Sequence, residues 1–300
     1  MNKFTKFLAV IIAILVLSVV LTPLFYSLTQ PYFKFEKIFN RLIMIFGVLA
    51  ALGFVIWNQR KKDSSSHVPT WREYGFDFSQ KWRRLFGLGF LAGAFTVLFI
   101  VGFEITFGPP SVRQPLEFLR FVEWFFTGVG GGLAVGVIEE FFFRGFIYTQ
   151  LQKKISVWLA VVLANAFYAL CHFFDNGQIF IPQNPTMYDA IRLLFGYLEP
   201  LARRPFDILP EFAGLFLFGV LLNLAFIRTG SLFLSIGLHT GAVFLIKFQH
   251  AFVEKGSEVY HSFYGNRPYY DGPFEWVSLA FLGCLIWMLA PRIAPKSLQK

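Results

Sequence analysis

The chain has 300 residues, of which 56% are apolar, 20% aromatic and only 15% charged. A soluble domain carries about a quarter charged residues, so this composition and a mean hydropathy of +0.56 exclude an ordinary soluble globule. The sequence therefore predicts an all-α, polytopic integral membrane protein. The formal net charge of +9 comes from lysines and arginines scattered between apolar blocks. This pattern favours contact with an anionic lipid bilayer and argues against nucleic acid as a partner.

Eight apolar segments predict membrane-spanning helices. They are Phe7–Leu28, Leu42–Trp57, Phe86–Phe107, about Phe121 to Gln152, Val157–Phe174, Phe212–Ile227, Leu232–Phe248 and Phe274–Ala290. The first is interpreted as a retained span, because its apolar run is too long for a signal peptide and no small-x-small site follows. An even number of spans places both termini on one side. The excess of Lys and Arg there predicts cytoplasmic termini, and we expect a bacterial cytoplasmic membrane.

These spans suggest three regions. Residues 1–120 hold three N-terminal spans, residues 121–248 hold four spans that carry the chemistry, and residues 249–300 form a polar loop and the last span. Within the connection 175–210, apolar residues at helical spacing predict a helix lying in the membrane interface. They are Met187, Ile191, Leu194, Leu198 and Leu201. Cys171 and Cys284 fall inside predicted spans, so we expect no disulfide framework.

A glycine stripe leads into the most unusual charged residues of the chain. Gly128, Gly132 and Gly136 recur every fourth residue, and the same register continues to Glu140 and Arg144. On a helix this spacing leaves a groove into which a neighbouring backbone can pack. Residues four apart also meet on a helix, so we expect an ion pair between Glu140 and Arg144.

Glu139 points about 100° away from Glu140 and has no cation at helical spacing. A carboxylate without a local partner in apolar surroundings is a candidate general base. The alternative is that both acids lie at the membrane surface and only solvate the end of the helix. Glu139 and His172 lie at similar distances, roughly 20–25 Å along their helices, from the turn at Lys153. His239, at roughly 15 Å from its own turn, completes a candidate site within the membrane thickness.

Two polar residues share a helix face with His172. Tyr168 and Asn165 precede it at spacings that place all three side chains on one side. They could orient the His172 ring, or they could tie helices together. We therefore count both as supporting residues.

Three motifs in order resemble those of a known family. They are E-E-x-x-x-R at 139–144, the histidine motif that ends at His172, and G-L-H-T-G at 237–241. This pattern, over about Phe121–Phe248, resembles the CAAX protease and bacteriocin-processing family, which includes the type II CAAX prenyl endopeptidases and the bacterial Abi proteins. The resemblance implies that Glu139 activates the hydrolytic water together with His172, that His239 helps to form the oxyanion site, and that Glu140 and Arg144 support them.

The sequence departs from the family pattern at two positions. Tyr168 replaces the usual phenylalanine of the histidine motif, and Val243 stands where the third motif usually has Asn or Asp. Loss of an oxyanion donor elsewhere lowers rates by about 10²–10³. Asn223 or Asn165 are candidate replacements.

The sequence is compatible with hydrolysis with or without a metal ion. Glu139, His172 and His239 would also make a hydrolytic zinc set, but no H-E-x-x-H motif is present. Because a glutamate–histidine pair can activate water without a metal, the preferred interpretation requires no cofactor and zinc is the alternative.

We therefore expect an intramembrane endopeptidase that hydrolyses a peptide bond in a membrane-associated protein or peptide. Two alternatives use the same residues. A proton-coupled secondary transporter would use the buried carboxylates as a relay, and a catalytically inactive relative would act by binding a partner.

Overall fold

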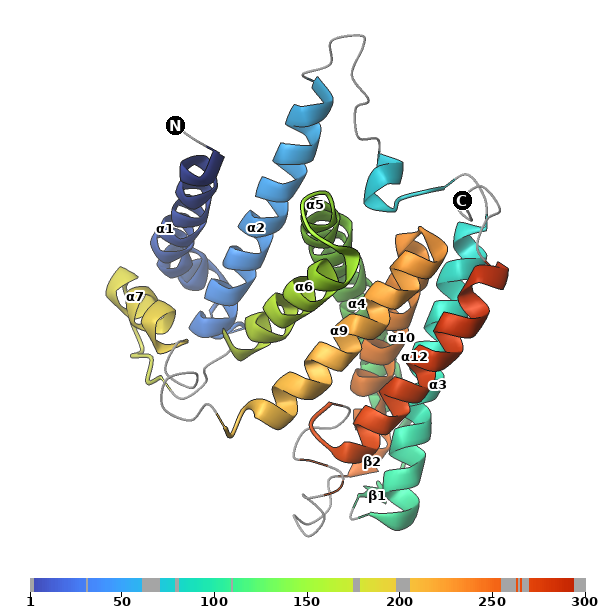
Figure 1. Ribbon diagram of the computed structural model, residues 1–300. Helices are drawn as coiled ribbons and strands as arrows, with labels where there is room; N and C mark the ends of the chain where they lie inside the picture. The colour runs from blue at the N-terminus through green and yellow to red at the C-terminus, as the bar shows by residue number, and fades with distance from the viewer. Residues whose placement is uncertain are drawn as a thin grey trace. The chain divides into compact units, whose positions relative to one another are not determined.

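The computed structural model describes residues 3–30, 32–60, 71–78, 81–108, 110–174, 179–197, 206–254, 263, 265 and 270–293 (Figure 1). Its α-helices are α1 (Lys3–Thr29), α2 (Phe35–Arg60), α3 (Trp82–Phe107), α4 (Phe118–Glu140), α5 (Thr149–Gln152), α6 (Val157–Cys171), α7 (Met187–Gly196), α9 (Leu209–Thr229), α10 (Leu232–Phe248) and α12 (Pro273–Ile293). The short elements are the 3-10 turns η1 (Trp71–Tyr74), η3 (His172–Phe174) and η4 (Gln249–Ala251), the π-helix η2 (Phe141–Tyr148), and the strands β1 (Ser111–Val112) and β2 (Val253–Glu254).

Seven of the described helical segments are long and apolar enough to cross a membrane. This confirms the predicted all-α membrane bundle. The remaining predicted span is shorter than expected: α6 ends at Cys171, and His172–Phe174 continues as a 3-10 turn. Fifteen helical residues rise only about 22 Å, which is less than the roughly 30 Å of a hydrocarbon core. Cys171 and Cys284 form no disulfide bond with each other.

The chain packs as two compact units, residues 1–68 with 170–208, and residues 69–169 with 209–300. In the first unit, α1 packs against α2 and α7. The predicted interfacial segment does form a helix, α7. It begins with a capping box in which the Thr186 backbone N–H donates to Asp189 at 2.8 Å. Leu198 and Leu201, which belong to the same predicted pattern, lie outside the described residues.

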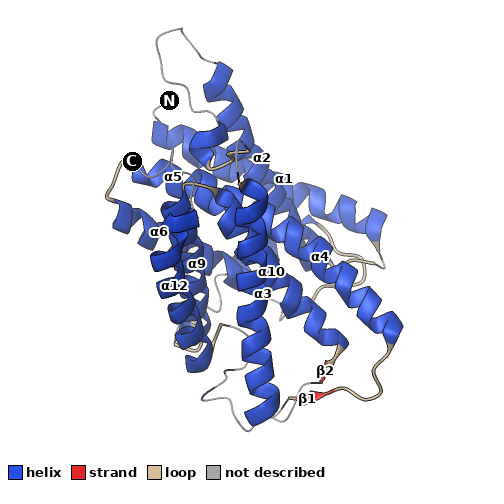
Figure 2. Ribbon diagram, turned by 90° about the vertical axis from the view of Figure 1, so that its right-hand side faces the viewer, coloured by secondary structure: helices blue, strands red, loops and turns tan. Residues whose placement is uncertain are grey.

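The second unit is built around α10. This helix packs along α3 and α4 and also contacts α9, while α12 packs against α9 (Figure 2). Most of α10 is buried, because neighbouring helices cover it on several sides. The side chains that α10 carries are therefore held rigidly inside the unit.

The glycine stripe of α4 faces the backbone of α10, as the spacing predicted. A Cβ atom at Gly132 would lie 2.8 Å from the Thr240 carbonyl oxygen, and one at Gly128 would lie 2.9 Å from that of Phe244. Real Cβ atoms are not found so close to a carbonyl oxygen, so only glycine permits this approach. The contact brings the carboxyl end of α4 beside the middle of α10.

The helix that carries the two glutamates does continue to Gln152, but not as one α-helix. Residues Phe141–Tyr148 form a π-helix, and α5 follows. The Thr149 hydroxyl donates to the Arg144 carbonyl oxygen, five residues earlier, at 3.1 Å. Single turns of π-helix within an α-helix are rare and are often found at functional sites. This one starts directly after Glu140.

Candidate active site

Arg144 is the anchor of a buried polar network. Its side chain and that of Glu140 are both 0% exposed, and Arg144 Nη1 lies 2.7 Å from Glu140 Oε1. Nη2 donates to Asn165 Oδ1 at 3.3 Å and to the Gly219 carbonyl oxygen at 3.2 Å. The predicted ion pair is therefore confirmed. Burial of Glu140 also rules out the alternative that this acid only solvates the end of the helix.

The aromatic ring of Tyr168 covers the other side of this arginine. The Arg144 guanidinium carbon lies 4.4 Å from the centre of the ring, a distance typical of a cation–π contact. Tyr168 is itself fully buried on α6. One guanidinium thus joins η2 to α4, α6 and α9, and the position of Glu140 depends on all of them.

His239 lies between the two glutamates. Its Nδ1 is 2.8 Å from Glu140 Oε1 and its Nε2 is 3.9 Å from Glu139 Oε2. Because a carboxylate can only accept, Nδ1 carries the hydrogen that it donates to Glu140. Nε2 is then the nitrogen directed toward Glu139. Glu140 consequently orients the histidine as well as pairing with the arginine.

Aromatic side chains fix the plane of the imidazole. Phe218 meets the His239 ring edge-on, with ring centres 5.3 Å apart and planes at 86°. Tyr168 does the same from α6 at 6.4 Å and 82°. With its side chain only 3% exposed, His239 has little freedom to turn away from the carboxylates.

Glu139 is more exposed than Glu140, whose Oε1 is held by Arg144 and His239, while Oε2 of Glu140 has no hydrogen-bond partner among the described residues. The Glu139 side chain is 15% exposed, and its Oε2 is buried without a hydrogen-bond partner among the described residues. His239 Nε2 lies 3.9 Å from this oxygen, close enough for a small molecule to bridge the two. Glu139 is therefore the carboxylate of the pair that is free to act on a bound water.

Asn165 and Asn223 form one amide pair. Asn165 Nδ2 donates to Asn223 Oδ1 at 3.0 Å and to the Val161 carbonyl oxygen at 2.8 Å, while its Oδ1 accepts from Arg144. Asn165 is thus occupied in holding the arginine. Asn223 keeps a buried Nδ2 with no partner in the described part of the chain. Of the two residues considered as replacements for the polar group missing at Val243, Asn223 is the one with an available donor.

His172 is the first residue of η3 and belongs to the first unit. Its partnership with Glu139, expected from equal depth, remains a prediction. Glu139, Glu140, Arg144, Asn165, Tyr168 and His239 all belong to the second unit. Within that unit Glu140, Arg144, Asn165, Tyr168 and His239 are in direct contact, with Glu139 at their edge.

The described residues do not assemble a metal site. Nowhere among them are three His, Cys, Asp or Glu side chains grouped closely enough to hold a metal ion. Within the second unit, Glu140 Oε1 already accepts from Arg144 and His239, which leaves Glu139, Glu140 Oε2 and His239 Nε2 as candidate ligands. His172, the third member of the predicted zinc set, belongs to the first unit, so zinc remains an alternative prediction.

The contact between Glu140 and His239 is not apparent from the sequence, because 99 positions separate them. A usable signal nevertheless exists. The glycine stripe places Glu140 on the face of α4 against which a second helix packs. Had α10 been identified as that helix, His239 would have been expected to meet Glu140. The π-helix that follows Glu140 has no comparable sequence signal.

Comparison with known proteins gives one match. Residues 121–245 match the family model described as "Type II CAAX prenyl endopeptidase Rce1-like". The matched segment contains both glutamates, His172 and His239, so the resemblance expected from the three motifs is confirmed over this segment. No curated protein and no solved structure matches the chain.

Proposed function

We propose that this integral membrane protein, whose residues 121–245 form an Rce1-like type II CAAX prenyl endopeptidase domain, hydrolyses a peptide bond in a membrane-associated protein or peptide. The observation that carries the proposal is the placement of His239. One ring nitrogen is held by Glu140 at 2.8 Å and the other is directed toward Glu139 at 3.9 Å. A carboxylate beside an oriented imidazole is the arrangement that general acid–base catalysis requires.

In the proposed reaction Glu139 accepts a proton from a water molecule, and His172 assists in activating that water. The water oxygen attacks the carbonyl carbon of the scissile bond, which moves negative charge onto the carbonyl oxygen. His239, carrying both ring protons, donates Nδ1–H to Glu140 and presents Nε2–H to this oxyanion. The carbon–nitrogen bond then breaks, and Glu139 returns its proton to the leaving amine.

The buried network supports this assignment of roles. Arg144 forms an ion pair with Glu140, and the same carboxylate oxygen holds the imidazole of His239. Tyr168 and Phe218 keep the ring from rotating. Preorganised groups of this kind lower a barrier because they need no rearrangement as charge develops.

The substrate can be sought directly in membranes. Cells producing the wild-type protein or Glu139→Gln are compared for the protein termini present in their membrane fractions. We expect a small set of new termini that appears with the wild type and is lost with Glu139→Gln. If no terminus depends on Glu139, the protein is not a protease of the membrane proteins in that cell.

A proton-coupled transporter is the second candidate, and the π-helix favours it. The change of hydrogen bonding begins directly after the two carboxylates, and transporters often interrupt their helices at such sites. Proton-coupled uptake into proteoliposomes that is abolished by Glu139→Gln would favour the transporter. A folded protein that neither cleaves nor transports, yet binds a partner tightly, would favour the inactive relative that Val243 permits.

A further inference from the structure

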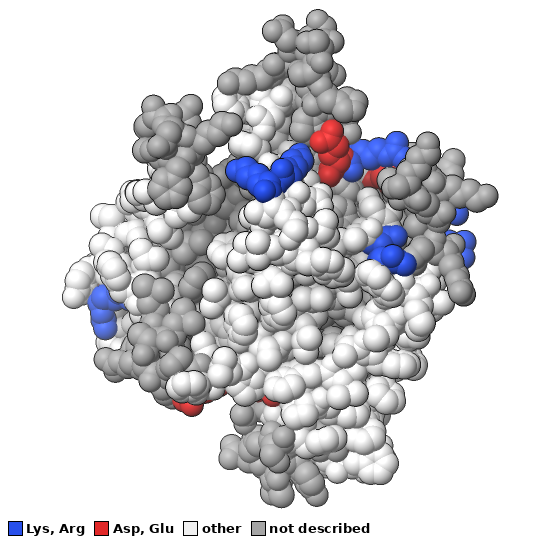
Figure 3. Space-filling view, viewed as in Figure 1, with Lys and Arg blue, Asp and Glu red and all other residues white. Residues whose placement is uncertain are grey.

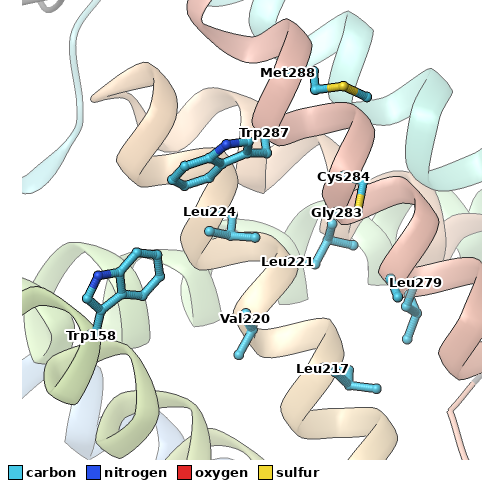
Figure 4. Close-up of a pocket in the computed structure, with 11 residues that line it drawn as sticks. Trp158, Leu217, Val220, Leu221, Leu224, Leu279, Gly283, Cys284, Trp287 and Met288 are labelled. Atoms are coloured by element: carbon cyan, nitrogen blue, oxygen red, sulfur yellow. The ribbon is translucent and has the colours of Figure 1, made fainter.

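The second unit contains an apolar groove that the proposed reaction does not use. It encloses about 600 Å³ between α6, α9 and α12, within the roughly 300–1,000 Å³ typical of ligand pockets. Figure 4 shows the residues that line it, almost all of them apolar. They are Trp158, Leu217, Val220, Leu221, Leu224, Leu279, Ala280, Gly283, Cys284, Trp287 and Met288.

The floor of the groove is hollow because of one glycine. Gly283 on α12 faces α9, and a Cβ atom added there would reach Leu221 and Leu224 only at 3.8 and 4.0 Å. A Cβ atom would therefore fit here without a clash, and the glycine leaves that space unfilled. An apolar chain entering the groove would be in contact with α9 and α12 at once.

Two tryptophans close one end of the groove. Trp158 of α6 and Trp287 of α12 lie next to each other beside α9 (Figure 4), with ring centres 6.3 Å apart. Tryptophans are enriched at the level of lipid headgroups. This end of the groove is thus expected to lie at the membrane–water interface, and the apolar remainder to lie among the acyl chains.

Arg228 lies at the same end. Its guanidinium carbon is 4.2 Å from the centre of the Trp287 ring, and Nη2 donates to the Trp287 carbonyl oxygen at 3.0 Å. Nε is buried and has no hydrogen-bond partner among the described residues. No described carboxylate forms an ion pair with this arginine. A positive charge is therefore fixed at the mouth of the groove.

The charge pattern of the surface agrees with this arrangement. In Figure 3 the surface along α9 and α12 is almost free of charged side chains, while Lys and Arg lie near the upper ends of these helices. We propose that the groove binds an anionic glycerophospholipid, with one acyl chain along Gly283 and the phosphate at Arg228. An arginine suits a phosphate because its planar group donates two parallel hydrogen bonds. This inference does not depend on the proposed hydrolysis.

Native mass spectrometry of the full-length protein tests the proposal. The protein is titrated with phosphatidylglycerol and, separately, with phosphatidylcholine of the same acyl chains. We expect one phosphatidylglycerol to be retained in preference to phosphatidylcholine. Arg228→Gln should weaken phosphatidylglycerol binding about fivefold, since one cation near anionic lipid contributes about 1 kcal/mol, whereas Arg228→Lys should keep the preference.

Matched variants separate this groove from the general membrane surface. Arg83→Gln removes an arginine that also lies over a tryptophan, 5.3 Å from the Trp82 ring, but outside the groove, so it should leave lipid binding unchanged. Gly283→Phe should fill the hollow and abolish retention of the lipid. Ala280→Phe, on the exposed lining, makes the same test if Gly283→Phe does not fold.

Three results would overturn the proposal. Equal retention of the two lipids by the wild type would remove the role of charge. Equal losses in Arg228→Gln and Arg83→Gln would show that any surface cation suffices. Undiminished binding by a folded groove-filling variant would show that the lipid binds elsewhere.

Discussion

At the scale of single residues, the network around Arg144 separates two adjacent glutamates into different environments. Glu140 is fully buried and its Oε1 is held by both Arg144 and His239, whereas the Glu139 side chain is 15% exposed. The pairing of Glu140 with Arg144 could be predicted because it depends only on helical spacing. The contact with His239 depends on how α4 and α10 pack, and local sequence does not determine that.

Removing the arginine should destabilise the protein strongly. Arg144→Met leaves Glu140 as a buried charge without its cation, and breaking a buried pair in this way costs about 3–5 kcal/mol. Thermal unfolding in detergent should show a large decrease in the melting temperature. In the double variant Glu140→Gln, Arg144→Met, the loss of stability should be smaller than the sum of the losses in the two single variants, because neither buried charge remains. Purely additive losses would mean that the pair is not coupled.

His239 should be needed for turnover more than for substrate binding. If its Nε2–H stabilises the oxyanion, His239→Gln should lower kcat by about 10²–10³ and change KM little. Glu140→Gln should lower kcat less, because the ring keeps its aromatic neighbours but loses its ionic partner. Steady-state kinetics on a substrate identified from membrane termini measures kcat and KM for both variants. An unchanged kcat in His239→Gln would remove this residue from the reaction.

At the scale of elements, close contact of α4 with α10 brings the glutamates to the histidine. The glycine stripe predicted that a backbone would pack against α4, and the structure identifies α10 as that backbone. The π-helix that follows could not be predicted, because its hydrogen-bond pattern depends on the tertiary setting of Phe141–Tyr148.

Two neighbouring glycines of α4 provide a matched test of this contact. Gly132→Ala places a Cβ atom 2.8 Å from the Thr240 carbonyl oxygen, whereas nothing lies within 4 Å of a Cβ atom at Gly130. Overpacking of this kind typically costs about 1–3 kcal/mol, so the melting temperature of Gly132→Ala should fall. Gly130→Ala should be neutral or slightly stabilising, since alanine favours a helix by up to about 1 kcal/mol. Equal effects at both positions would contradict the packing.

The amino end of α7 should weaken in acid. A hydrogen bond from the Thr186 backbone N–H lowers the pKa of Asp189 below its usual value, about 3.9. A lowered folded-state pKa contributes stability above the unfolded pKa, and this contribution is lost as pH falls through the folded pKa. Amide hydrogen exchange in α7 should therefore be slower in the wild type than in Asp189→Asn at pH 6. The difference should shrink as pH falls below about 3.9 and disappear only below the lowered pKa of Asp189. A difference that persists in acid would contradict the role of the carboxylate.

At the scale of the whole molecule, composition and hydropathy suffice to predict an integral membrane helix bundle, because length and apolarity decide which helices can cross a bilayer. They do not predict that α6 ends at Cys171, since Phe173 and Phe174 are as apolar as the residues before them. The packing into two units depends on contacts between distant segments, which no local pattern records. His172 and Glu139 fall in different units, so their pairing rests on sequence alone.

We propose that both termini face the cytoplasm, as the distribution of Lys and Arg suggests. Alkaline phosphatase fused after Lys300 should then be inactive in a bacterial host, and a fluorescent protein fused there should be bright. The opposite pair of results would place the carboxyl terminus outside.

The central claim is that Glu139 activates the water that cleaves a peptide bond. The most direct measurement is the cleavage rate of a membrane-anchored substrate by purified protein in proteoliposomes, with the bound metal content determined on the same samples. Glu123→Gln, an exposed acid on the same helix, serves as the matched control. We predict that Glu139→Gln loses cleavage and that Glu123→Gln keeps the wild-type rate. Cleavage by Glu139→Gln at the wild-type rate would contradict the account.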